Sequence, residues 1–454
     1  MFRFHTGDRD RENGSNAIMS VYSIIHYLIM PFVLLRLFWR GLKAPAYRER
    51  WRERFGFGKS LTSGNPRIWI HAVSVGEVQA AVPIVHALRV RYPKTHILVT
   101  TTTPTGAAHV AGAFGEAVTH RYVPYDLPDC VQRFLDRVTP SLVLILETEL
   151  WPNILQACRE RAIPVLLVNA RLSTKSAGAY RRVSGTTREM LANISAIAAQ
   201  GSNDADRLIT LGANPRHVQV TGSVKFDAGL PSGAREAGNT MRECWGADRP
   251  VWIAASTHEG EEERILDVFR KVRKSVPGSL LVLVPRHPER FPKIEALARR
   301  HGYDTLLRSN LPKTTTPGSC MEVEVFIGNT MGELPMLYAA SDVAFVGGSL
   351  VPIGGHNMLE PAVMGIPILF GPHVFNFMEI ARNLCACGGA RQVQDKMELT
   401  SMLIALLQDA NARRDMGRKA EAFVQDNGGA LDKIMTLVGN FYGSGDSGDL
   451  HGKE

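Results

Sequence analysis

The sequence predicts an α/β protein with two doubly wound parallel sheets, one in each of two domains that face a cleft. Short apolar runs alternate with amphipathic stretches along the chain, which is the pattern of a parallel sheet covered by helices on both faces. The chain has 454 residues, more than one hydrophobic core usually serves, so we expect two domains. A hydrophobic content of 45% and a charged content of 21% exclude a disordered or fibrous protein.

The predicted strands are the short apolar runs. In the first half of the chain they are residues 68–73, 96–101, 142–146, 164–168, 197–199 and 218–221, and in the second half residues 251–255, 280–284, 323–327, 343–346 and 366–370. Amphipathic stretches such as 77–91 and 204–211 lie between them and are expected to form helices.

The polar, glycine-rich stretch "DAGLPSGAREAGNT" (227–240) is the best candidate for an inter-domain linker. We therefore expect an N-terminal segment over 1–42, a first domain over 43–230, a linker over 231–245, a second domain over 246–430 and a tail over 431–454. In open sheets of this kind ligands bind beyond the carboxyl ends of the strands. Polar residues just after strands are therefore the candidates for function.

The N-terminal segment contains "AIMSVYSIIHYLIMPFVLL" (17–35), which has no Asp, Glu, Lys or Arg and is long enough to enter a bilayer. A basic stretch follows, with Arg36, Arg40, Lys43, Arg48, Arg50, Arg52 and Arg54. We expect a membrane anchor over about 17–38 whose basic flank stays cytoplasmic, where anionic head groups attract it. The alternative is a buried helix of the first domain. The net charge of +8 also predicts an anionic partner: a phosphate substrate, a lipid head group or a nucleic acid.

The six cysteines are scattered along the chain. Cys385 and Cys387 are close in sequence, but no second pair matches them, so we expect no zinc site. Reduced thiols in a cytosolic protein are the expectation for all six.

Acidic and basic residues follow three predicted strands of the first domain. Glu77 in "SVGEVQAA" opens a helix, where a carboxylate can serve chemistry or only complement the helix dipole. Glu147 and Glu149 in "ETELWPN" suit proton transfer or the binding of substrate hydroxyls. Lys225 in "GSVKFD" can stabilise developing negative charge or be a solvated linker side chain.

The second domain has a comparable series. The stretch "ASTHEGEEE" (255–263) opens a helix that its residues can cap, and without an HExxH pattern His258 and Glu261 indicate a metal site only weakly. Arg286 and His287 in "VPRHPERF" follow the strand at 280–284, where an arginine fork suits phosphate or carboxylate. Glu333 starts another expected helix.

The stretch "GGSLVPIGGHNMLEPA" (347–362) gives the clearest indication of ligand binding. Its four glycines let the backbone turn tightly and approach a ligand, and a helix expected to begin at 356–358 would point free amides at a phosphate. Glu360 can accept hydrogen bonds from two ribose hydroxyls. We interpret the stretch as a nucleotide site, and because it matches neither GxGxxG nor GxxxxGK[ST], a dehydrogenase or an ATPase is disfavoured.

A series of motifs in a fixed order gives a more specific indication. It includes "HAVSVGEV", "ETELWPN", "GSVKFD", "ASTHEGEE", "LVPRHPERF", "TMGEL" and "FVGGSLVPIGGHNMLEPA", and it covers about residues 19–430. In these motifs the chain resembles the bacterial 3-deoxy-D-manno-octulosonic acid (Kdo) transferases of lipopolysaccharide synthesis. The resemblance implies a GT-B fold of two Rossmann-like domains and the inverting transfer of Kdo from CMP-Kdo to a hydroxyl of a tetraacylated lipid A precursor.

The resemblance also implies the setting of the reaction. The expected partners are CMP-Kdo, the acylated precursor and inner-membrane lipid, with no nucleic acid, no cofactor and no metal. The expected location is the cytoplasmic side of the bacterial inner membrane. By the same resemblance Glu77 is the general base, and Glu147 and Lys225 stabilise the transition state. The positions expected to bind CMP are Pro285, Arg286, Met331, Gly332, Glu333, Asn357, Met358, Leu359 and Glu360.

The chain departs from the family pattern in "VPI" between "VGGSL" and "GGHN", and in the Thr-rich loop 309–322, which puts the detail of the donor loop in doubt. Two other functions are compatible with parts of the sequence. One is a GT-B enzyme that uses a UDP-sugar on a lipid-linked acceptor, and the other is a membrane-tethered nucleotide or lipid binder without catalysis. The presence of both Glu77 and Glu147 argues against the second.

Overall fold

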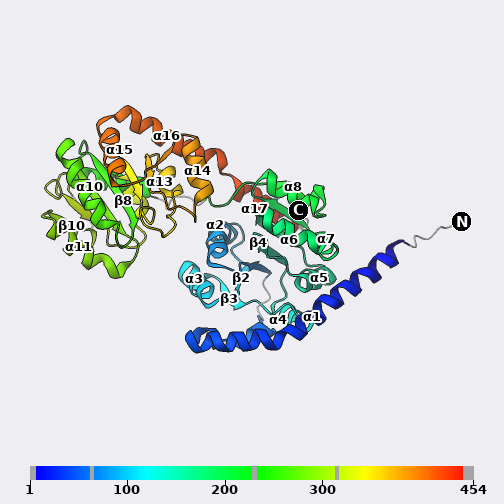
Figure 1. Cartoon of the computed structure of the whole chain (residues 1–454). Coiled ribbons are helices and arrows are strands. Elements are labelled where there is room, and N and C mark those ends of the chain that lie inside the picture. The colour runs from blue at the N-terminus through cyan, green and yellow to red at the C-terminus, as the bar shows by residue number, and fades with distance from the viewer. Residues whose placement is uncertain (1–6, 62–65, 228–232, 312–315, 443–454) are drawn as a thin grey trace, which may run out of the picture. The chain divides into compact units, whose positions relative to one another are not determined.

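The chain divides into two compact units, each with its own parallel sheet and covering helices (Figure 1). The computed structural model describes residues 7–61, 66–227, 233–311 and 316–442. Unit 1 comprises Met1–Ala228 and Gly428–Glu454, and unit 2 comprises Gly229–Asn427. In the described residues each unit has a seven-stranded sheet, so the predicted class of two doubly wound α/β domains is confirmed.

The sheet of unit 1 has the strand order β3-β2-β1-β4-β5-β6-β7, and all neighbouring strands are parallel. Its strands are β1 (Arg67–His71), β2 (His96–Thr101), β3 (Thr119–Tyr122), β4 (Leu142–Leu146), β5 (Val165–Ala170), β6 (Ala196–Ala199) and β7 (Val218–Val220). The chain runs outward from β1 to β3, returns to β4 beside β1, and then runs outward to β7. The strand order therefore reverses between β1 and β4.

Helices cover both faces of this sheet, which is why strands such as β4 (LVLIL) are apolar and buried along their whole length. The helices of unit 1 are α1 (Gly7–Lys43), α2 (Val75–Arg91), α3 (Pro104–Phe114), α4 (Pro128–Val138), α5 (Pro152–Glu160), α6 (Thr174–Arg182), α7 (Ser184–Ala192), α8 (Ser202–Thr210) and α17 (Ala430–Tyr442). One core lies under α2, α3 and α17, and the other lies under α4, α5, α7 and α8.

The sheet of unit 2 has the order β10-β11-β9-β8-β12-β13-β14, with the reversal between β8 and β12. Its strands are β8 (Val251–Thr257), β9 (Leu280–Pro285), β10 (Thr305–Leu307), β11 (Val325–Ile327), β12 (Val343–Val346), β13 (Ile368–Phe370) and β14 (Ala390–Gln392). Its helices are α9 (Ala234–Trp245), α10 (Glu262–Ser275), α11 (Phe291–Arg300), α12 (Leu334–Ala339), α13 (Leu359–Val363), α14 (Met378–Ala386), α15 (Lys396–Gln408) and α16 (Ala410–Asn427). The helices α10, α11 and α15 cover one face, and α9 and α12 cover the other.

Two segments differ from the sequence-based division. Most of the expected linker is α9, whose Met241 and Trp245 are buried in the core of unit 2. The part of the expected tail that the structure describes, 431–442, lies entirely in α17, whose Ile434 packs into the core of unit 1. Asp227 accepts hydrogen bonds from the backbone N–H groups of Gly429 and Leu431, which ties the start of α17 to the end of the first segment of unit 1.

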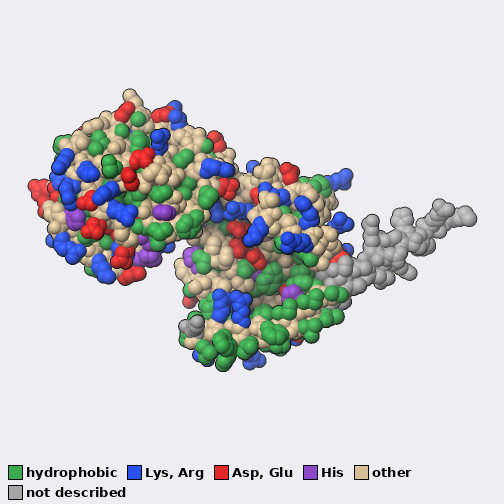
Figure 2. Space-filling model, in the orientation of Figure 1, with side chains coloured by type: hydrophobic (Ala, Val, Ile, Leu, Met, Phe, Trp, Pro, Cys, Tyr) green, Lys and Arg blue, Asp and Glu red, His purple; other side chains and the backbone are tan. Residues whose placement is uncertain are grey.

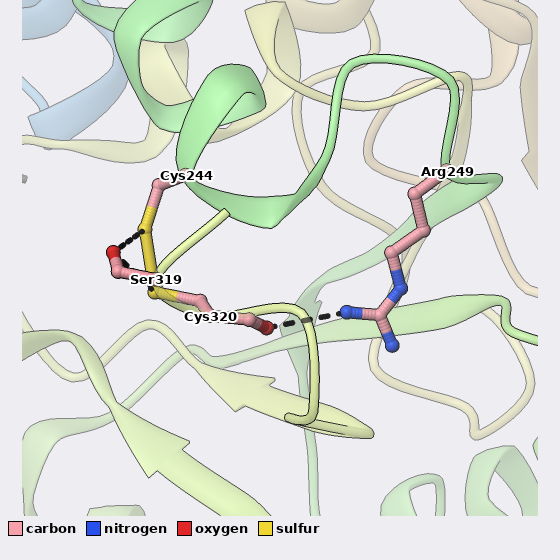
Figure 3. Close-up of a disulfide and its surroundings, with 4 residues drawn as sticks. All are labelled: Cys244, Arg249, Ser319 and Cys320. Atoms are coloured by element: carbon pink, nitrogen blue, oxygen red, sulfur yellow. Dashed lines mark hydrogen bonds between the residues drawn. A yellow bond between two sulfur atoms is a disulfide. The ribbon is translucent and has the colours of Figure 1, made fainter. Parts of the chain in front are cut away.

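The cysteines also differ from expectation. Cys244 at the end of α9 and Cys320 form a disulfide, with their Cα atoms 5.6 Å apart (Figure 3). Both are buried, and Ser319 lies beside the bond. The expectation of reduced thiols is therefore wrong for this pair, because residues 76 positions apart in sequence become neighbours only in the folded unit. Cys130, Cys158, Cys385 and Cys387 are free.

The cysteine assignment predicts a thiol count. We expect four reactive thiols in protein unfolded without reductant, and six after reduction. The Cys244→Ser variant should give five without reductant, because Cys320 loses its partner. Titration with a thiol-specific chromophore measures all three, and six thiols in the unreduced wild type would contradict the pairing.

Candidate active site

Glu77 lies in the first turn of α2, directly after β1, and is 6% exposed. Its Oε1 accepts a hydrogen bond from the Ser74 hydroxyl at 2.8 Å, and its Oε2 accepts one from the Val73 backbone N–H at 2.8 Å. The Ser74 oxygen in turn accepts the Glu77 N–H, so Ser74 is the N-cap of α2 and is bonded to Glu77 in both directions. Glu77 therefore does take part in the start of the helix, as the sequence suggested. The hydrogen bonds of this arrangement also fix the position of its carboxyl group.

The surroundings of Glu77 suit a proton acceptor. Burial raises the pKa of its carboxyl to about 7, against the lowering effect of the hydrogen bonds from Val73 and Ser74. The carboxylates of Glu149 and Glu147 raise this pKa further. A base whose pKa lies near the working pH is the most effective proton acceptor.

Glu147 and Glu149 follow β4, the strand next to β1. Glu147 has a positive φ of 56°, an uncommon backbone conformation for a residue other than glycine, and its N–H donates to Val168 O at 3.1 Å. The Trp151 indole N–H donates to Glu149 Oε2 at 3.1 Å. The "ETELW" turn thus holds both carboxyl groups at the carboxyl edge of the sheet.

Lys225 is brought back toward this edge by a residue that the sequence did not indicate. The Oδ1 of Asn169, at the end of β5, accepts the backbone N–H of Val224 at 3.3 Å. Val224 is fully buried in the core that also contains Val78 and Leu146. The segment after β7 therefore turns over the sheet edge, and the Lys225 side chain is exposed there. Asn169 has a positive φ of 52°, which no sequence pattern reveals.

The glycine-rich loop of unit 2 turns as expected. Gly348, Gly354 and Gly355 have φ values of 68°, 110° and 76°, and the N–H groups of the last two donate to Gly348 O. A Cβ on Gly347 would lie 2.7 Å from Ser256 O, so only glycine fits at that position.

A buried carboxylate holds this loop. Glu261, fully buried, accepts four backbone N–H groups: those of His258 and Gly348 on Oε2, and those of Ser349 and Leu350 on Oε1. Glu261 thereby ties the loop after β8 to the loop after β12. The sequence indicated helix capping for this stretch, but the carboxylate of Glu261 binds the glycine loop and makes no side-chain cap to α10.

The remaining positions expected to bind CMP line the carboxyl edge of unit 2. Arg286 is exposed, and its backbone N–H donates to Thr257 O at 3.0 Å. Pro285 is the last residue of β9 and is buried. Glu333 pairs with Arg308 at 2.9 Å. Beside it, Met331 is 69% exposed and Gly332 has a φ of 82°.

Asn357 and Glu360 form a hydrogen-bonded pair, since the Asn357 amide donates to Glu360 Oε1 at 3.1 Å. Burial raises the pKa of Glu360, against the lowering effects of Asn357 and Arg286. The side chains of Met358 and Leu359 are buried, so only their backbone groups can face a ligand. The helix expected at 356–358 begins at Leu359 and has five residues, and the Asn357 side chain accepts the Leu359 N–H just before it. So short a helix has a small dipole, and the contribution to phosphate binding that we expected from it is therefore small.

The apolar N-terminal segment is part of α1. In the described residues one helical stretch, Val21–Leu42, is long and apolar enough to cross a membrane, with a mean hydropathy of 1.8. Its large apolar side chains are exposed, among them Leu28 (69%), Phe32 (72%) and Trp39 (68%), and Figure 2 shows hydrophobic side chains gathered along it.

The opposite stripe of α1 packs against unit 1, where the helix contacts α5 and α7. The Ser23 hydroxyl donates to Asn153 Oδ1 at 3.1 Å, and the Tyr27 hydroxyl donates to Asp129. The basic stretch after α1 does not all face outward. Arg54 is buried with its guanidinium 4.1 Å from the Tyr122 ring centre, so it is a packing residue and does not reach lipid.

Comparison with known proteins gives consistent results. A family model described as "3-Deoxy-D-manno-octulosonic-acid transferase (kdotransferase)" matches residues 49–228. A 3-deoxy-D-manno-octulosonic acid transferase of Haemophilus influenzae is 39% identical over 92% of this chain and 97% of its own length. One of Bordetella pertussis is 36% identical over 83% of this chain and 87% of its own length. The crystal structure of MurG from Acinetobacter baumannii, 13% identical, has a TM-score of 0.51 over 83% of this chain and 99% of its own, and shows a shared fold.

Two doubly wound sheets, with acids at the reversal point of one and a glycine-rich loop at that of the other, are the features of the GT-B fold, which MurG shares. The identity of 39% over 92% of the chain is specific enough to name the family. The chain belongs to the 3-deoxy-D-manno-octulosonic acid transferases.

The raised pKa of Glu77 predicts a pH-dependent stability. In the folded state its pKa is about 7, against 4.5 as the reference, so between these values the folded protein holds the proton more tightly than the unfolded chain. The contribution of Glu77 to stability therefore falls as the pH rises through this window. The quantity to measure is the unfolding free energy of Glu77→Gln minus that of wild type. We expect this difference to increase between about pH 4.5 and pH 7, by at most about 1.4 kcal/mol per pH unit, and to stay constant above pH 7.

Urea unfolding at a series of pH values measures this difference. The matched control is Glu160→Gln at the exposed end of α5, for which we expect no such rise. A pH-independent difference for Glu77→Gln would contradict the raised pKa.

The four hydrogen bonds to Glu261 predict a large effect of removing its charge. In Glu261→Gln an amide NH₂ replaces one oxygen, so two backbone N–H groups lose their acceptor and face a donor. We expect a loss of about 2–4 kcal/mol in unfolding free energy, measured by urea or thermal unfolding. Glu259→Gln, whose side chain is 88% exposed, is the control and should change stability by under about 0.5 kcal/mol. Equal stability of the two variants would exclude the holding role of Glu261.

Proposed function

We propose that the protein is an inverting glycosyltransferase that moves Kdo from CMP-Kdo to a hydroxyl of an acylated lipid A precursor in lipopolysaccharide synthesis. The observation that carries this proposal is the buried carboxyl of Glu77 at the reversal point of unit 1, with a pKa of about 7, in a chain of this family. Its hydrogen bonds to Ser74 and Val73 fix the carboxyl group but leave it able to take a proton.

In the proposed reaction Glu77 takes the proton of the acceptor hydroxyl as that oxygen attacks the anomeric carbon of Kdo. The bond from this carbon to the phosphate oxygen breaks, and CMP leaves with the electron pair. The transition state has oxocarbenium character, as at other glycosidic centres. Attack on the face opposite the departing phosphate inverts the anomeric configuration.

Glu147 and Lys225 are proposed to stabilise this transition state by charge. The Glu147 carboxylate, close to Glu77, suits the positive charge that develops on the sugar ring. The exposed ammonium of Lys225 suits the negative charge that develops on the departing phosphate. Asn169 acts on Lys225 indirectly, since it positions the backbone of Val224.

The donor is proposed to bind at the carboxyl edge of unit 2. The Arg286 guanidinium offers two parallel donors to an anionic oxygen group, and the Asn357–Glu360 pair offers polar atoms for the ribose hydroxyls. Pro285, Met331, Gly332, Glu333, Met358 and Leu359 complete the proposed site. CMP carries one phosphate, so its charge as a leaving group is smaller than that of a nucleoside diphosphate.

The exposed apolar side of α1 is proposed to enter the cytoplasmic leaflet of the bacterial inner membrane. Its inner stripe is bonded to the rest of unit 1 at Ser23 and Tyr27, near the start of the apolar stretch. A helix that crossed the bilayer would have to leave this surface, so we favour a helix that lies in the plane of one leaflet. This arrangement keeps both units on the side where the acceptor's phosphorylated sugars are exposed.

The test of the proposed function is a transfer assay with CMP-Kdo and the acylated precursor, read by mass spectrometry of the lipid. We expect wild type to add Kdo and Glu77→Gln to lose about 10²- to 10⁴-fold in kcat, because a positioned general base contributes that much. CMP affinity should be unchanged in the variant, since Glu77 belongs to unit 1. Glu160→Gln is again the control and should keep full activity.

Two outcomes would contradict the proposal. Thermal protection by UDP but not by CMP would indicate a transferase with a different donor. Tight CMP binding by wild type without any turnover would indicate a nucleotide binder without catalysis.

A further inference from the structure

Three histidines gather at the carboxyl ends of three neighbouring strands in unit 2. His258 follows β8, His287 follows β9, and His356 lies in the loop after β12; these strands are adjacent in the order β9-β8-β12. The His258 ring meets that of His287 edge to face at 5.3 Å. The proposed function assigns no part to any of the three.

His258 and His356 are joined directly through their ring nitrogens. Their Nε2 atoms are 2.7 Å apart, and their ring planes differ by 3°. The ring centres are 5.0 Å apart, whereas the two Nε2 atoms are 2.7 Å apart. The difference is about the width of one ring, as expected when two rings lie end to end with their Nε2 atoms facing each other. The rings therefore do not stack face to face.

This contact requires one proton between the two rings. Two lone pairs, or two N–H groups, would repel at this distance, so one Nε2 donates and the other accepts. In the neutral pair the donor ring therefore keeps a free lone pair on Nδ1. A third proton on that nitrogen would make the pair a cation whose outer nitrogens are both donors.

The backbone around the pair is built to hold it. The Glu261 carboxylate accepts the backbone N–H of His258 and that of Gly348. Gly348 has a φ of 68°, and a Cβ there would lie 3.0 Å from the Nε2 of His356. Glycine at this position therefore leaves the room that the two rings occupy.

Several titratable and charged groups face the pair. They are Arg286 and His287 from the loop after β9, Arg290 beyond them, and the Glu261 carboxylate below. Arg290 is paired with Glu259 and Glu262, and Glu261 is occupied by backbone N–H groups. In the described part of the chain the Arg286 guanidinium has no ion pair.

These surroundings keep the free pair neutral. Burial, then His258 and then Arg286 lower the pKa of His356 to about 4, and burial and the neighbouring cations lower the pKa of His258 as well. An anion placed beside the pair and Arg286 would favour the protonated form, because the opposite charge offsets these effects.

We propose that the His258–His356 pair is an anion-binding element of the donor site, which binds an anionic oxygen group of the donor together with Arg286 and takes up a proton as it does so. The oxygen group is the phosphate or the sugar carboxylate, both of which CMP-Kdo carries. This inference rests on the proposed function, which supplies the donor. The two histidines are specificity-determining residues and take no part in the bond-making step.

The experiment is calorimetric titration of the whole protein with cytidine and with CMP near pH 6, in buffers of different ionisation enthalpy. If the pair binds the phosphate, we expect CMP binding to wild type to be accompanied by uptake of about one more proton than in the His258→Gln and His356→Gln variants, since glutamine cannot carry the charge. Comparison of proteins with the same ligand cancels the titration of the CMP phosphate itself. His301→Gln, at the end of α11, is the matched control and should behave as wild type.

The two sources of the anion give different results. If the pair binds the phosphate, both variants should bind CMP roughly ten-fold more weakly and cytidine as wild type does. If the pair binds the sugar carboxylate, CMP binding should be unchanged, and KM for CMP-Kdo should rise by a similar factor with a smaller change in kcat.

The inference is overturned if wild type binds CMP and both variants match it in CMP affinity, proton uptake and KM for CMP-Kdo. If wild type binds no CMP, the donor assignment of the proposed function is wrong, and the inference, which rests on it, is wrong as well. A thermal melting curve for each variant establishes folding, and either variant alone decides the question because the shared proton needs both rings.

Discussion

The reversal of strand order in each sheet determines where the candidate functional residues of that unit lie. After β1 the chain enters α2 on one face of the sheet, and after β4 it enters α5 on the other, so the loops above these neighbouring strands diverge. Glu77 lies in the first turn of α2, and Glu147 lies in the loop after β4. In unit 2 the same reversal separates β8 from β12, and His258 and His356 meet across it. One topological constraint, applied twice, places the acids in one unit and the anion-binding groups in the other.

Two buried glutamates at these edges show how the number of donors sets the role of a carboxyl group. Glu261 accepts four backbone N–H groups, so its oxygens are fully used, and it acts as a fixed part of the loop structure. Glu77 accepts two hydrogen bonds and lies near two other carboxylates. Its negative charge is therefore poorly compensated, and the group can exchange a proton near neutral pH. Both side chains are buried glutamates, and their hydrogen-bond partners differ.

The sequence predicted the central strands because they are buried on both faces and are therefore continuously apolar, as in β4. It missed the short edge strands β3, β10 and β14, whose residues are mixed and partly exposed. It predicted that Glu77, Glu147 and Arg286 come soon after strands, which the structure shows, since this position follows from the strand itself. It could not show the contact between His258 and His356, 98 residues apart, or the hold of Glu261 on the glycine loop. These depend on which strands become neighbours.

The outer and inner sides of α1 obey different demands. Ser23 is bonded to Asn153, and Tyr22 reaches Asp126, whose carboxylate accepts the N–H groups of Asn153 and Ile154 at the start of α5. A shortened protein that began after α1 would expose the buried side chains of Asn153 and Asp126 to water. It would therefore lose buried hydrogen bonds of unit 1 as well as the exposed apolar surface of α1. An unrelated apolar helix therefore could not replace α1 without loss. A chimera with such a helix would need hydroxyl groups at the positions of Tyr22 and Ser23 to restore the hydrogen bonds to Asp126 and Asn153.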